Sequence, residues 1–60
     1  MTKNLQLKRN LELLEMKECV RTDRWTDFAI CERRVRVELG GRLTPREKDA
    51  IQTIIERRSR

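Results

Sequence analysis

The segment NLQLKRNLELLEMKECV, residues 4–20, decides the fold that this sequence predicts. Wound as a helix at about 100° per residue, it carries apolar side chains on two roughly opposite sides. One side holds Leu7, Leu11 and Leu14, and the other holds Leu5, Leu13, Met16 and Val20, with Cys19 at its edge. A surface helix usually buries a single stripe. We therefore expect one side to pack within the chain and the other to contact a second molecule.

The length of the chain, 60 residues, limits how much apolar surface it buries. Chains of about 60 residues bury only about 60% of their unfolded surface, and natural small domains compensate with disulfides, metals, close helix packing or oligomerisation. Charged residues make up 42% of the sequence and hydrophobic residues 37%, a balance that is also found in disordered chains. The regular apolar spacing favours a folded helical protein, and we expect it to form a homodimer.

A second helix is predicted over residues 24–39, after a turn rich in Thr and Asp. Its apolar side carries Trp25, Phe28, Val35 and Leu39, with Cys31 beside it, whereas Ile30 and Val37 lie on the other side. The two aromatic residues are expected in the core, with an exposed interface anchor as the alternative. Residues 35–39, VRVEL, alternate apolar and charged side chains before Gly40-Gly41. A short strand in a hairpin is therefore the alternative to a helix there.

The third helix, predicted over residues 45–58, has the clearest boundary signal in the chain. Thr44-Pro45-Arg46-Glu47 is a capping box with proline at the first helical position. The apolar stripe that follows consists of Ala50, Ile51, Ile54 and Ile55. Leu43 is expected to pack on this stripe from outside the cap.

The segment Leu43-Thr44-Pro45-Arg46-Glu47, continuing to Ile51 and Ile54, resembles the opening helix of LuxR-type and sigma-factor region 4 DNA-binding domains. The resemblance covers residues 43–54. In those families a turn and a recognition helix that reads DNA follow the opening helix, and the printed sequence has no counterpart of that helix. Because the same residues also make a capping box, the resemblance does not lead us to predict a DNA-reading function for this chain.

Residue types that carry catalysis or bind metals are scarce. The chain has no histidine, which removes the commonest general base and the commonest zinc ligand. Its two cysteines, Cys19 and Cys31, have no metal-binding spacing. We expect them to be reduced and buried, with a disulfide across the antiparallel hairpin as the alternative. Gly40-Gly41 lacks the Lys and Ser/Thr of a phosphate-binding loop. We therefore predict no enzyme, no metal, no cofactor and no small-molecule substrate.

The net charge of +5 favours contact with nucleic acid or with an acidic protein surface. Most acidic residues lie three or four positions from a basic residue, as in helix surface pairs. Glu32 instead falls on the apolar side of the second helix, where we expect an arginine to pair with it and fix helix alignment. Two buried aromatics would leave no platform for stacking bases. Candidate contacts to nucleic acid or an acidic partner are Arg33, Arg34, Arg36, Arg57, Arg58 and Arg60.

We predict an all-α fold in one small domain, residues 1–60. It consists of an antiparallel hairpin of helices 4–20 and 24–39 with helix 45–58 packed against it, assembled as a homodimeric helical bundle. The predicted function is that of a small non-enzymatic regulatory or adaptor protein that binds a protein target. The predicted partner-binding residues are Leu7, Leu11, Leu14, Ile30 and Val37.

The size and simplicity of the chain are analogous to those of modulators made by phages and other mobile elements. A small basic DNA- or RNA-binding transcriptional regulator is the alternative function, and a structural subunit of a larger complex is a third interpretation. No segment has the apolar core of a signal peptide or the length of a membrane span. We therefore expect a cytoplasmic protein without membrane contact.

Overall fold

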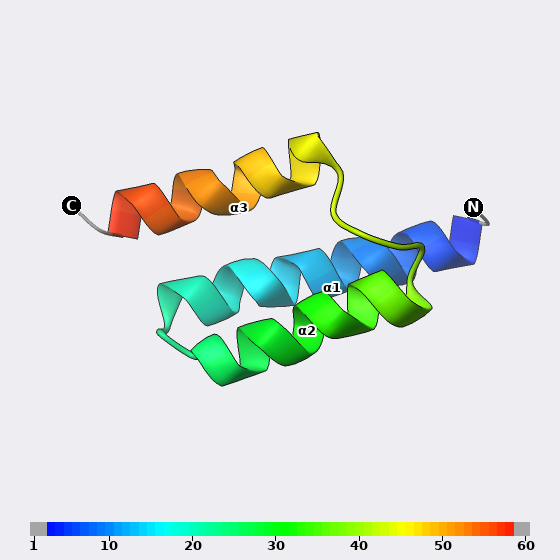
Figure 1. Cartoon of the computed structure of the whole chain (residues 1–60), viewed down its shortest axis with the longest axis horizontal. Helices are drawn as coiled ribbons and strands as arrows, with labels where there is room; N and C mark the ends of the chain where they lie inside the picture. The colour runs from blue at the N-terminus through cyan, green and yellow to red at the C-terminus, as the bar shows by residue number, and fades with distance from the viewer. Residues whose placement is uncertain (1–2, 59–60) are drawn as a thin grey trace.

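The computed structural model describes residues 3–58 and forms three α-helices in that range (Figure 1). They are α1 (Lys3–Arg21), α2 (Trp25–Glu38) and α3 (Pro45–Arg58). Each end differs from the predicted one by at most one residue. The described residues contain no strand, so the hairpin alternative for residues 35–39 is wrong. Those residues stay helical to Glu38, and Leu39 is the C-cap. No helix in this part of the chain is long and apolar enough to span a membrane.

Helix α1 is the central helix of the structure. Packing contacts among residues 3–58 join α1 to α2 and α1 to α3, and Figure 1 shows α2 and α3 on either side of α1. Helix α2 runs antiparallel to α1, and α3 runs parallel to it. The Cα atoms span only 15 Å along the shortest axis. The three helices therefore form a thin, open arrangement, and part of the α1 surface stays outside the core.

The core is built on one of the two apolar stripes of α1. Met16 and Val20 are fully buried, and Leu13 is 9% exposed. The buried residues that pack with them are Cys31, Val35, Leu39 and Ile51, with Leu5, Phe28, Leu43, Ile54 and Ile55 partly buried around them. The expected core stripe of α1 and the expected packing of Leu43 are thus confirmed.

The turn between α1 and α2 is a Schellman motif with aspartate in the place usually taken by glycine. Asp23 has a φ of 63°, its N–H donates to the Val20 carbonyl at 3.3 Å, and the Arg24 N–H donates to the Cys19 carbonyl at 2.8 Å. Because this motif delays the start of α2 to Trp25, the predicted burial of Trp25 is wrong.

Trp25 is the first residue of α2 and is 44% exposed. Its indole N–H donates to Asp23 Oδ1 at 2.6 Å, and its ring meets that of Phe28 edge-on with 5.7 Å between centroids. The indole N–H is therefore held by the turn and the ring contacts Phe28, while the residue as a whole remains partly open to solvent. Of the two aromatic residues, only Phe28 packs against the core as predicted.

The connection from α2 to α3 turns sharply at two glycines. Gly40 and Gly41 have φ values of 106° and 102°, a region that side-chain-bearing residues rarely adopt. The predicted capping box then begins α3. The Thr44 N–H donates to Glu47 Oε1 at 2.9 Å, and the Glu47 N–H donates to Thr44 Oγ1 at 3.2 Å.

Candidate functional site

The most exposed large aliphatic side chains of the described residues lie on α1 and α2. On α1 they are Leu7, Leu11 and Leu14, which are 55%, 66% and 59% exposed, and on α2 they are Ile30 and Val37, which are 51% and 67% exposed. We call these five residues the apolar face. On α1 they occupy the stripe opposite the core, because Leu13, Met16 and Val20 already fill the space against α2 and α3. The structure thus leaves exposed the five side chains that were predicted to bind a partner.

A shallow groove runs between the two helices within the apolar face. Leu11 lies on one wall and Ile30 on the other, and the remaining lining residues are Glu12, Glu15, Asp27, Cys31 and Arg34. Arg34 Nη1 donates to Glu12 Oε1 at 2.8 Å. The apolar face therefore consists of two aliphatic stripes separated by a strip of charged side chains.

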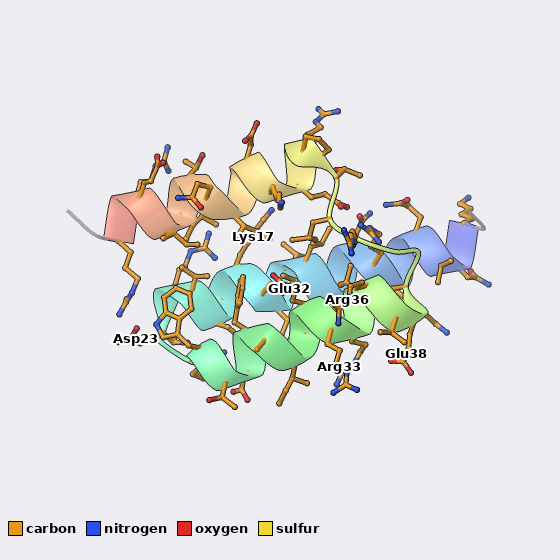
Figure 2. All side chains as sticks on the ribbon, in the orientation of Figure 1. Lys17, Asp23, Glu32, Arg33, Arg36 and Glu38 are labelled. Carbon is orange, nitrogen blue, oxygen red and sulfur yellow. The ribbon has the colours of Figure 1, made fainter. Side chains whose placement is uncertain are left out.

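The arginines predicted to contact nucleic acid do not form one surface. Arg34 is paired with Glu12. Arg58 pairs with Asp23 at 2.9 Å and donates to the Arg21 carbonyl at 3.0 Å, so it ties the end of α3 to the first turn. Arg60 lies outside the described residues, and Figure 2 shows Arg33 and Arg36 on different sides of α2. The predicted set is therefore divided between structural pairs and separate surfaces.

One of these arginines, Arg36, joins a cluster of charges that the sequence did not reveal. A depression between α2, the connection and the start of α3 is lined by Glu32, Arg36, Arg42, Leu43 and Lys48. Figure 2 shows Glu32 and Arg36 on the side of α2 nearer to α3. Glu32 forms no ion pair with any residue between 3 and 58, so its predicted role in fixing helix alignment is wrong.

Arg9, and not Glu32, fixes the alignment of the helices, and the sequence analysis did not predict this. Its side chain is 3% exposed, and all five guanidinium N–H groups donate. Nη1 donates to the carbonyls of Leu39 and Gly41 at 2.9 Å each, and Nη2 donates to the Arg42 carbonyl at 2.9 Å. Arg9 also donates two hydrogen bonds to the Glu47 carboxylate, from Nη2 to Oε1 at 2.6 Å and from Nε to Oε2 at 2.9 Å. A single side chain from α1 therefore fixes both the α2–α3 connection and the first turn of α3.

The Arg9–Glu47 pair shifts the acidity of both partners. Hydrogen bonding from Arg9, together with the bonds from Thr44, lowers the pKa of Glu47 from 4.5 to about 2. The same hydrogen bond raises the pKa of Arg9 further above its ordinary value. Both groups are therefore charged throughout the physiological pH range, and the pair acts as a permanent clamp.

Both cysteines are free and buried, as predicted, and no disulfide joins them. Burial, followed by the neighbouring Glu12 carboxylate, raises the pKa of the Cys31 thiol to about 12. A thiol with that pKa is protonated near neutral pH and is a poor nucleophile or metal ligand. Among the described residues, no three His, Cys, Asp or Glu side chains come together as a metal site would require.

Comparison with protein-family models, with curated protein sequences and with solved structures gives no match.

Proposed function

We propose that this chain is a small non-enzymatic regulatory or adaptor protein that binds another protein through its apolar face. The observation that carries the proposal is the exposure of five large aliphatic side chains on two adjacent helices. Exposed aliphatic residues scattered singly are common on proteins, whereas Leu7, Leu11 and Leu14 follow one another at helical spacing and form one stripe along α1. Exposed apolar patches of this kind mark interaction sites. An amphipathic helix of a target would lay its own apolar residues along the stripe of α1.

A second copy of this chain is the proposed occupant of the apolar face when no target is bound. Covering a side chain that is about half exposed stabilises by roughly 1 kcal/mol. In a twofold dimer each copy contributes five such side chains, and the summed effect exceeds the lower estimates of the cost of association, about 4 kcal/mol. The expected dimer is weak, so it exchanges readily for a target.

The charges beside the leucine stripe favour an antiparallel arrangement of the two copies. Lys8 lies about one turn before Leu11, and Glu15 lies about one turn after it. If the twofold axis passes near Leu11, then Lys8 of each copy lies opposite Glu15 of the other. Such charge matching fixes the alignment and disfavours the parallel arrangement.

Self-association is tested by sedimentation equilibrium over roughly 1 μM to 1 mM protein, the concentration range of weak binding. The wild-type chain is expected to shift from monomer to dimer within this range. Leu11→Asp is expected to weaken the dimer at least tenfold, because it would place two carboxylates opposite one another in an apolar contact.

The matched control is Gln52→Asp, which introduces the same side chain at an exposed position of α3. It should leave self-association unchanged. The proposal fails if wild-type protein stays monomeric at the highest concentration and unfolds in a sharp transition. It also fails if both aspartate variants weaken the dimer equally.

A further inference from the structure

The side of α2 that carries Arg36 lies away from the apolar face. At about 100° per residue, Trp25, Glu32 and Arg36 fall within about 40° of one another, whereas Ile30 and Val37 lie roughly a quarter-turn or more away. Trp25 and Arg36 are separated by about 17 Å along the helix, at 1.5 Å per residue. The stripe thus has an exposed indole at one end and a positive charge at the other.

The positive end of this stripe is reinforced from outside α2. Arg42 in the connection and Lys48 in the first turns of α3 line the same depression as Arg36. None of these three cations pairs with an acidic group of residues 3–58, whereas other basic residues, such as Arg9, Arg34 and Arg58, are paired. Three basic side chains therefore converge on one open depression and are available to a ligand.

We propose that this stripe binds single-stranded nucleic acid. One base would stack on the exposed ring of Trp25, and backbone phosphates would contact Arg36, Arg42 and Lys48. Stacking on an aromatic ring combined with a positive groove is the general mode of binding for single strands. The roughly 17 Å between the two ends can be spanned by a few nucleotides of one strand, at the lower end of the sites of about 4–16 nucleotides found for single-strand-binding folds. The indole is well suited to stacking because its hydrogen bond to Asp23 and its contact with Phe28 hold it in place.

Two acidic groups lie along the path of the proposed strand. Asp23 carries a charge that is already paired with Arg58 at 2.9 Å, so it opposes a phosphate backbone only weakly. Glu32 lines the depression without an ion pair, so its carboxylate opposes binding directly. The stripe therefore predicts that removing the charge of Glu32 strengthens binding, while removing a basic charge weakens it.

Trp25 is the single tryptophan, and the chain has no tyrosine, so its emission reports on the proposed site alone. Oligo-deoxythymidine of about 12 nucleotides, within the range of known single-strand sites, is expected to quench this emission on titration at low salt. With three phosphate contacts, the slope of log affinity against log salt should be about −2. Labelled oligonucleotide followed by anisotropy extends the measurement to variants that lack the indole.

The proposal predicts that some variants weaken the affinity for the oligonucleotide and that one variant strengthens it. Arg36→Gln and Lys48→Gln should each weaken binding and reduce the salt slope by about 0.7. Trp25→Leu should weaken binding about tenfold with the slope unchanged. Glu32→Gln should strengthen binding. Arg57→Gln, at an exposed arginine outside the depression, is the control and should retain near-wild-type affinity.

Several outcomes would overturn the proposal. It fails if the oligonucleotide changes neither emission nor anisotropy at low salt, or if Arg57→Gln weakens binding as much as Arg36→Gln does. It also fails if duplex DNA, a phosphorylated peptide or inorganic phosphate at equal phosphate concentration competes as well as the single strand. Leu11→Asp should bind the oligonucleotide with wild-type affinity. The proposal for this stripe and the proposal for the apolar face are therefore tested independently.

Discussion

Replacing Arg9 with methionine is expected to reduce the free energy of unfolding by about 3–5 kcal/mol, the range found when one partner of a buried ion pair is removed. Methionine fills much of the same volume but donates no hydrogen bond. The carbonyls of Leu39, Gly41 and Arg42 would lose this donor. The carboxylate of Glu47 would lose both bonds from Arg9 and keep the one from the Thr44 N–H. Because small domains have little stability to spare, much of the protein should be unfolded at ambient temperature.

The measurement is urea unfolding followed by circular dichroism at a fixed protein concentration, since any dimer would make stability depend on concentration. Arg24→Met is the matched control. Arg24 makes two exposed ion pairs, each at 3.6 Å, with Glu15 and Asp27, and its Nε donates to Thr22 Oγ1 at 2.8 Å at the surface. Exposed pairs of this kind contribute about 0–1 kcal/mol. Arg9→Lys should be nearly as unstable as Arg9→Met, because one ammonium group cannot reach the same acceptors in a planar fork. Equal stability of Arg9→Met and Arg24→Met would contradict the clamp.

Acidification is expected to remove the contribution of Glu47 to stability. The folded-state pKa of about 2 lies below the ordinary value of 4.5, so the unfolded state binds the proton more readily. The stabilisation is therefore fully present above about pH 5 and is lost as the pH falls through 4.5 towards 2. A shift of this size corresponds to about 3 kcal/mol, at 1.36 kcal/mol for each pKa unit.

Other carboxylates titrate in the same window, so the contribution of Glu47 is isolated by Glu47→Gln. The glutamine is nearly isosteric and keeps an oxygen that can accept from Arg9 and from the Thr44 N–H. The stability difference between the wild-type chain and the variant should be large at pH 6 and should shrink towards pH 2. A difference that stays constant across this range would show that the charge of Glu47 contributes nothing to folding.

The sequence predicted the three helices because each carries a strong local signal. The capping box at Thr44–Glu47 acts within a few residues and forms as predicted. The pair of glycines after Leu39 also acts locally, because both adopt the positive φ values that turn the chain after α2. The two apolar stripes of α1 follow from the helix period alone. Their spacing correctly indicated that Leu7, Leu11 and Leu14 would stay outside the core.

The errors concern features that depend on one residue of register or on distant partners. Because α2 starts at Trp25, the indole lies in the first turn at the surface. The left-handed conformation of Asp23 sets this start, and the sequence does not predict it because the position is not a glycine. Arg9 lies four residues from both Leu5 and Leu13, so its place on the buried stripe was readable. Its acceptors lie 30 to 38 residues further along the chain, beyond the reach of a local pattern.

Methyl NMR on dilution tests most directly whether the apolar face is a contact surface. The methyl signals of Leu7, Leu11, Leu14, Ile30 and Val37 should move with protein concentration between about 1 mM and 10 μM, the range of a weak dimer. The signals of the core residues Leu13, Val20 and Val35 should stay in place. Concentration-independent signals across the whole face, in a protein that remains folded, would contradict a self-contact through this surface. Shifts confined to α3 would contradict it equally.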